Sequence, residues 1–288
     1  WGSEAQKTRY LRPLFTGEEI WCQLFSEPGS GSDFAGLSSK GVQDGDEWVV
    51  NGQKVWTTLA HLSRWGLLVV RTNPEAVKHA GLTAFVVDMH APTVQTLPLR
   101  QMTGEAEFNE VFFTDTRIHE SEMLGQPGDG WRVSLTTLMN ERQSIGGSIP
   151  QRGSGTIANL MKEWADAPAW KKDDATRDEV MKLWIRAEVL RLTNIRANNN
   201  RKMGDPGPEG SISKMAGANL NKDIYEALVN LMGADALLYG SYEMVRPEHA
   251  MEYATPQKAF LRSRANSIEG GTTEVMLNIL GERVLGLP

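Results

Sequence analysis

The chain begins with short β-rich segments separated by turn-forming residues and continues with long segments in which apolar residues recur at helical spacing. The first pattern predicts strands, with Asn51-Gly52 as a hairpin turn, at residues 21–26, 47–56, 67–71, 83–89, 94–99 and 110–115. The second pattern, clear at Val180, Leu183 and Ala187, predicts helices at residues 130–164, 174–202, 209–238, 241–252 and 272–285.

Strands followed by helices, without alternation, predict an α+β fold rather than a doubly wound nucleotide-binding fold. We expect an antiparallel β-barrel-like middle domain followed by a C-terminal helical bundle. The expected boundaries are 1–18 for a helical remnant and linker, 19–125 for the β domain and 126–288 for the helical domain.

Composition narrows the class of protein. The length of 288 residues predicts about two domains, and a net charge of -6 with dispersed Lys and Arg gives no footprint for nucleic acid. We find no apolar run of the roughly 18 residues that a membrane span needs. A single cysteine, Cys22, excludes an internal disulfide and indicates a reducing compartment. We therefore expect a cytoplasmic protein in a bacterium, or a mitochondrial matrix protein in a eukaryote.

A first motif, SEPGSGSD, occupies residues 26–33. It lacks the third glycine of a dinucleotide fingerprint and is followed by a strand-like segment, so we exclude a Rossmann site. A turn so rich in hydroxyls and backbone N–H groups is suited to a phosphate or a polar cofactor edge. A capped surface turn is the alternative.

A second motif, NGQKVWTT, follows at residues 51–58. Together the two motifs resemble the β domain of the acyl-CoA dehydrogenases, FAD enzymes that introduce an α,β double bond into acyl-CoA thioesters. The resemblance extends through Glu110–Phe113, the joint at 124–131 and the tail IEGGTTEV at 268–275, followed by GERVLGLP. It spans nearly the whole chain.

The resemblance implies a role for individual residues. Ser26 and Thr58 would supply hydroxyls at the N5/O4 edge of the flavin, and Trp56 would lie against the ring. The other implied cofactor-binding residues are Leu24 and Phe25 through their backbone, Ser32 at the pyrophosphate, and Thr272 and Glu274 at the adenine side. Two alternatives stand beside these roles: Trp56 as a core tryptophan and Thr272 as a helix cap.

Three features depart from the family pattern. Only Ser3–Leu14 resembles the N-terminal helical domain, as its last helix and linker, so substrate length is not readable. The Arg-x-x-Phe-Gly segment, through which one subunit of the family clamps its neighbour's FAD, is replaced by Met161–Pro168. Gly270 stands where short- and medium-chain members place their catalytic glutamate.

Two carboxylates compete for the catalytic base. Glu141, on the first helix after the β domain, resembles the base of the long-chain and isovaleryl branch, whereas Glu269 lies one residue from the tail position. We favour Glu141, with Glu269 second. Taken alone, Glu141 reads as a solvated helix glutamate paired one turn away. The backbone N–H of Gly270, with a flavin ribityl hydroxyl, would polarise the thioester carbonyl.

The expected reaction is FAD-dependent dehydrogenation of an acyl-CoA, with electrons passed to an electron-transferring flavoprotein. The resemblance also implies a homo-oligomer through the C-terminal helices. Two rivals remain open: an acyl-CoA oxidase, and a noncatalytic or half-site subunit in a heteromer with a second acyl-CoA-dehydrogenase-like chain, which the altered 161–168 segment motivates. No metal is expected.

Overall fold

The structure is a computed structural model that describes residues 1–146, 149–203, 207–249 and 255–288, without the side chains of 142–146. Contacts divide the chain into two compact units. One contains residues 1–139 and the segment that begins at Glu243, and the other contains residues 140–242 and the C-terminal part of the chain. We call the first the β unit and the second the helical unit.

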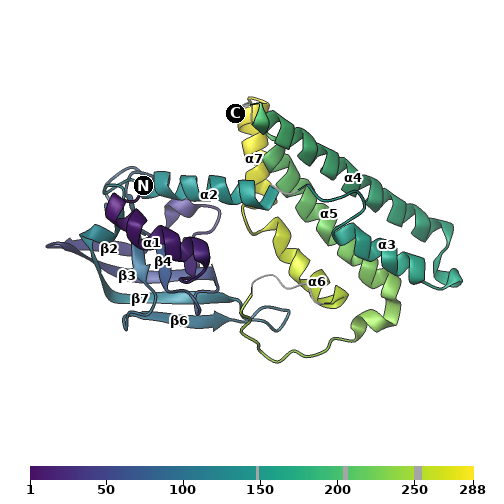
Figure 1. Ribbon diagram of the computed structural model, residues 1–288, viewed down its shortest axis with the longest axis horizontal. Coiled ribbons are helices and arrows are strands. Elements are labelled where there is room, and N and C mark those ends of the chain that lie inside the picture. Colours follow the sequence, from purple (N-terminus) through teal and green to yellow (C-terminus); the bar gives the residue numbers. More distant parts are fainter. Residues whose placement is uncertain (147–148, 204–206, 250–254) are drawn as a thin grey trace. The chain divides into compact units, whose positions relative to one another are not determined.

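The first unit is built on one sheet (Figure 1). Its strands run in the order β6-β7-β3-β2-β4-β5-β8, with β1 paired to β4. The strand bounds are β1 Trp21–Leu24, β2 Lys40–Asp44, β3 Glu47–Thr58, β4 Trp65–Arg71, β5 Leu82–Asp88, β6 Val94–Leu99, β7 Phe108–His119 and β8 Met123–Leu124.

This sheet confirms the α+β class and corrects two details. It is mixed rather than antiparallel, because β1 and β2 both pair with β4 in parallel. It is also open, with β6 and β8 at the ends of the described hydrogen-bonded path, so barrel-like describes it only loosely.

The predicted hairpin at Asn51-Gly52 is wrong. Both residues lie inside β3, and the hairpin turn is the preceding pair Gly45-Asp46, between Asp44 and Glu47. Gly45 has a φ of 66°, as a tight hairpin turn requires. Asn51 instead exchanges hydrogen bonds with Asp115 on β7: its amide donates to Oδ1, and its Oδ1 accepts from the Asp115 N–H, both at 2.9 Å.

Alternating apolar residues of the strands form the sheet core. The largest buried cluster contains Leu24, Val50, Leu68, Phe85 and Val111, all fully buried. Such burial provides most of the stability of a unit of this kind.

Helix α1, at Glu4–Thr16, confirms the helix expected at Ser3–Leu14 and begins with a capping box at Ser3. Its Tyr10 ring makes edge contacts with the rings of Trp21 and Trp65, at centroid distances of 5.2 and 5.1 Å. These contacts fix α1 against β1 and β4.

Six further α-helices follow in the residues that the structure describes. They are α2 Gly130–Gly146, α3 Thr156–Asp166, α4 Asp174–Lys202, α5 Glu209–Met232, α6 Pro256–Ser263 and α7 Thr273–Val284. In the helical unit α5 contacts α3, α4, α6 and α7, so it is the central helix (Figure 1). No helix in the described residues is long and apolar enough to cross a membrane.

Two predicted helices differ from the structure. The helix predicted over 130–164 is two helices, α2 and α3, and the residues described between them, 149–155, are not helical. Gly153 and Gly155 in this stretch have positive φ values of 72° and 79°, which glycine adopts most readily. The helix predicted over 241–252 is absent from its described part, 241–249, where Val245 instead pairs with Glu105 of the β unit. Residues 250–252 lie outside the described part.

Candidate functional site

A buried lysine connects the two sequence motifs of the β unit through hydrogen bonds. Lys54 of β3 donates from Nζ to Oε1 of Glu27 at 2.8 Å and to the carbonyl of Phe25 at 3.1 Å. Next to it, the Val55 N–H donates to the carbonyl of Ser26 at 2.9 Å. The backbone of the first motif is therefore held directly against the strand that carries the second.

Glu27 also organises the chain that follows it. Its Oε2 accepts from the Ser38 N–H and hydroxyl at 2.6 and 2.8 Å, and its Oε1 accepts from the Ser39 N–H at 3.0 Å. Burial alone would raise the Glu27 pKa, but the Lys54 charge and these hydrogen bonds outweigh it and lower the pKa to about 2. Desolvation lowers the pKa of Lys54 to about 8, against the opposing effect of Glu27. Both side chains are charged at neutral pH.

Trp56 lies on a β-bulge. Lys54 faces Val111 and Thr57 faces Asn109, so two residues of β3, Val55 and Trp56, oppose one residue of β7. Trp56 has a φ of 59°, which is strained for a bulky residue, and 59% of its surface is exposed. It is thus not a core tryptophan. The Trp56 ring makes an edge contact with the ring of Phe108, at a centroid distance of 5.9 Å.

Asn109 fixes the backbone beside this bulge. The side chain is fully buried, and its amide donates to the carbonyls of Thr57 and Glu107 at 3.0 and 3.1 Å. Its Oδ1 accepts from Arg246 at 2.7 Å. Arg246 belongs to the segment after Glu243 that joins the β unit, so a residue far along the sequence supports the bulge.

The SEPGSGSD motif forms an exposed turn with an open surface. Glu27 and Ser30 close it with two backbone hydrogen bonds at 2.9 and 3.0 Å. A Cβ added at Gly29 or Gly31 would meet no atom within 4 Å, and neither glycine has a positive φ. Nothing within the described chain therefore requires glycine there, whereas a ligand lying on the backbone would.

The remaining residues predicted to bind cofactor in this unit belong to the two motifs that Lys54 connects, or directly precede them. Leu24 and Phe25 are buried, so only their backbone groups are available to a ligand, and Ser26 follows them half-buried. Thr58 is half-buried two residues beyond Trp56, and Ser32 is exposed on the turn. The structure thus brings the ends of both motifs together.

In the helical unit, Glu141 lies on α2 and is half-buried. Thr272 is the N-cap of α7, where its hydroxyl accepts from the Val275 N–H at 3.2 Å, and Glu274 is exposed in the first turn. The capping interpretation of Thr272 therefore holds whether or not it also meets a ligand.

Glu269 has both carboxylate oxygens engaged. Oε2 accepts from buried Arg262 at 2.8 Å, and Oε1 accepts from the Asn266 amide at 2.7 Å. This arrangement suits Glu269 to holding the tail loop.

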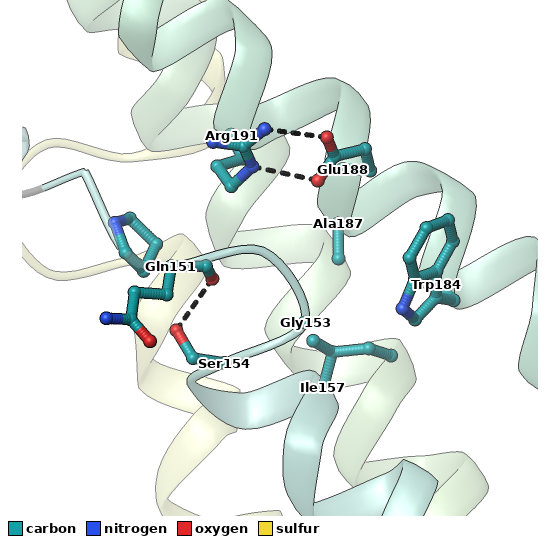
Figure 2. A pocket seen from close by; sticks show the side chains of 9 residues that line it. Gln151, Gly153, Ser154, Ile157, Trp184, Ala187, Glu188 and Arg191 are labelled. Carbon is teal, nitrogen blue, oxygen red and sulfur yellow. Dashed lines mark hydrogen bonds and ion pairs between the residues drawn. The ribbon is translucent and has the colours of Figure 1, made fainter.

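One cavity of about 30 Å³ lies among α3, α4 and residues 150–154, a volume near that of one water molecule. Figure 2 shows its wall, where Arg191 and Glu188 form a two-armed ion pair. None of the predicted site residues lines it. Over the described ranges, no cluster of His, Cys, Asp or Glu has the arrangement of a metal site.

Comparison with known families matches both parts of the chain. Residues 22–116 match the acyl-CoA dehydrogenase middle domain, and residues 128–285 match the acyl-CoA dehydrogenase C-terminal domain.

The chain belongs to the acyl-CoA dehydrogenase family.

Individual relatives agree with this assignment. The chain is 38% identical to the acyl-CoA dehydrogenase IpdE1 of Mycobacterium tuberculosis, over all of this chain and 72% of that protein. It is 36% identical to FadE34 of the same organism, covering 38% of that longer protein. In structure, it is similar to a chain of the ChsE4-ChsE5 complex of M. tuberculosis, with 27% identity and a TM-score of 0.82 over all of this chain and 74% of that one.

Proposed function

We propose that this oxidoreductase-family chain binds FAD and dehydrogenates an acyl-CoA thioester between its α and β carbons. The observation that carries the proposal is Trp56, an exposed and strained aromatic side chain on a bulge. Strained backbone persists where surrounding contacts enforce it, and it concentrates at functional sites. Here Lys54 and Asn109 supply those contacts.

The residues present fit the flavin. An isoalloxazine ring needs an apolar wall with a few donors at its polar edge. Trp56 offers an uncovered aromatic surface, and Ser26 and Thr58 offer hydroxyls. Backbone groups of Leu24 and Phe25 complete the edge. The open turn at Gly29 and Gly31, with Ser32, suits a pyrophosphate, and Thr272 and Glu274 would face the adenine side.

Bound FAD would supply the acceptor for the hydride that leaves the β carbon. The chain itself supplies the proton chemistry. Glu141 accepts the proton from the α carbon, which is weakly acidic because it adjoins a thioester. The Gly270 N–H donates to the thioester oxygen and stabilises the charge that develops there. An electron-transferring flavoprotein would be the final electron acceptor, as the family resemblance implies.

The test is Glu141→Gln in the full-length protein, since this change preserves shape and removes basicity. FAD and acyl-CoA binding are expected to persist, while the rate of flavin bleaching by acyl-CoA falls about 100-fold or more, within the range that general-base catalysis contributes. Glu179→Gln, an exposed glutamate of α4, is the matched control. If bleaching is unchanged in Glu141→Gln but lost in Glu269→Gln, Glu269 is the catalytic base. If bleaching is unchanged in both variants, the base belongs to another chain.

A second candidate is a half-site subunit of a heteromer. Two observations favour it: the segment Met161–Pro168 replaces the family's FAD-clamping sequence, and one similar structure is a complex of two chains. The test is the FAD content of the protein purified alone and after mixing with a second acyl-CoA-dehydrogenase-like chain from the same genome. Flavin that appears only on mixing would favour this candidate. Rapid flavin reoxidation under air would instead indicate an acyl-CoA oxidase.

A further inference from the structure

The loop between α6 and α7, which contains Gly270, is held by a lysine from another helix. Lys214 of α5 donates from Nζ to the carbonyl of Asn266 at 2.9 Å and also to the carbonyl of Gly271. One ammonium group thus joins two points of the loop that are five residues apart. Hydrogen bonds from a charged donor are about twice as strong as neutral ones.

Side chains hold the same loop from within. Asn221 of α5 donates to Oδ1 of Asn266 at 2.7 Å, and the Asn266 amide donates to Glu269 at 2.7 Å. Arg262 of α6 holds the other oxygen of Glu269. The Asn266 amide is therefore oriented by a donor on one side and an acceptor on the other.

Gly270 lies between two held residues. Glu269 is fixed through its carboxylate and Gly271 through its carbonyl, while Gly270 and Gly271 have left-handed φ values of 61° and 93°. Two successive glycines leave a backbone with many accessible conformations. The direction of the Gly270 N–H therefore depends on the contacts that hold its neighbours.

We propose that Lys214 is a positioning residue of the thioester site, which fixes the tail loop so that the Gly270 N–H points at the thioester oxygen. The proposal rests on the role of Gly270 in the proposed function. Lys214 contacts neither substrate nor cofactor in this role; it acts through the backbone of Asn266 and Gly271. Burial also lowers the pKa of Lys214, with Glu269 opposing the shift, as expected for an ammonium enclosed by the loop.

Misplacing a catalytic donor by about 1 Å is enough to slow a reaction by about 100-fold. In Lys214→Met, which keeps the length of the side chain and removes its donors, we expect flavin reduction by saturating acyl-CoA to slow by about 10- to 100-fold. The infrared carbonyl stretch of the bound thioester should shift toward its value in water. FAD affinity and the pH profile of reduction should stay unchanged, because neither the flavin residues nor Glu141 is altered.

Lys182→Met is the matched control, since Lys182 is an exposed lysine of α4 that pairs with Asp178 one turn away. Lys214→Arg keeps a charged donor and should restore part of the rate. If Lys214→Met fails to fold, Asn221→Leu removes the second contact to Asn266 and should shift the carbonyl stretch in the same direction by a smaller amount.

A normal rate and an unshifted carbonyl stretch in folded Lys214→Met would overturn the proposal, as would a lower melting temperature with no change in either. If the proposed function itself is wrong, the result differs: no acyl-CoA would bleach the flavin of the unsubstituted protein.

Discussion

The two lysines that hold functional backbone in this chain do so in different surroundings. Lys54 in the β unit is completely buried and contacts a carboxylate, Glu27, as well as the Phe25 carbonyl. Lys214 in the helical unit is half-buried and donates to two carbonyls, those of Asn266 and Gly271. The two lysines should therefore differ in what their removal costs. A buried ion pair becomes costly when one partner is removed, whereas a lysine on neutral carbonyls leaves no buried charge behind when it is lost.

The largest expected effect on stability is therefore at Lys54. Lys54→Met leaves Glu27 buried without its counter-charge and should lower the free energy of unfolding by about 3 to 5 kcal/mol. The double variant Lys54→Met/Glu27→Gln should regain part of that loss, because it buries no charge and its amide oxygen still accepts from the Ser38 N–H and hydroxyl, while the amide nitrogen replaces the oxygen that faced Ser39. Denaturant unfolding measures both. Lys214→Met should lose less, about 1.5 to 3 kcal/mol for hydrogen bonds to a charged group.

Lys7→Met, an exposed lysine on α1 paired with Glu4 at 2.7 Å, is the control for the stability series and should change little. An equal loss at Lys54 and Lys214, with no recovery in the double variant, would contradict the distinction between the two lysines.

The ion pair of Lys54 with Glu27 should also make the stability of the β unit depend on pH. The pKa of Glu27 is about 2 in the folded chain against an ordinary 4.5, so the unfolded chain binds the proton first as the pH falls. Its contribution to stability is complete above pH 4.5 and is lost as the pH falls toward about 2. The stability gap between the unsubstituted protein and Glu27→Gln, followed by melting temperature, should therefore shrink across that range. A gap independent of pH would show that the Glu27 charge contributes nothing.

Trp56 provides a test in which stability and cofactor binding separate. Asparagine tolerates the left-handed backbone better than tryptophan, so Trp56→Asn should change the free energy of unfolding by no more than about 1 kcal/mol. FAD affinity should fall about tenfold, because an aromatic contact is lost. Fluorescence titration with FAD measures this. Trp170→Asn, at a tryptophan that is 77% exposed, should leave FAD affinity unchanged, and equal affinities in both variants would remove Trp56 from the flavin site.

The smallest effect is expected at Gly31. Gly31→Ala adds a methyl group that meets no protein atom, so stability should stay the same or rise by about 0.4 to 1 kcal/mol. FAD affinity should fall about three- to tenfold, the equivalent of one hydrogen bond, because the methyl group holds a phosphate away from the backbone. Gly210→Ala on α5, where an added Cβ also meets nothing, should stabilise the helix without affecting FAD. Identical FAD affinities in the two variants would show that the turn does not meet the cofactor.

Much of the fold was predictable because its periodicities are local. The strands at 65–71, 82–88 and 94–99 and the helix at 174–202 lie within two residues of their predicted bounds, since alternating or helical spacing is a property of neighbouring residues. The errors have non-local causes. Asn51-Gly52 carries a strong hairpin signal, but its partner Asp115 lies on another strand. The segment 241–249 was expected to be helical, but it contacts the β unit through Val245 and Arg246.

By itself, the sequence determined the α+β class, the family and the identity of the candidate site residues, because motifs and periodicities are written in the order of side chains. Only the tertiary structure decided how those residues are held. It pairs Lys54 with Glu27, Glu269 with Arg262 and Lys214 with the Gly271 carbonyl, all of them residues that are not adjacent in the sequence. It also leaves Trp56 exposed. Burial and hydrogen bonding depend on which surfaces meet when the chain packs, and the spacing of residues along a sequence does not specify that.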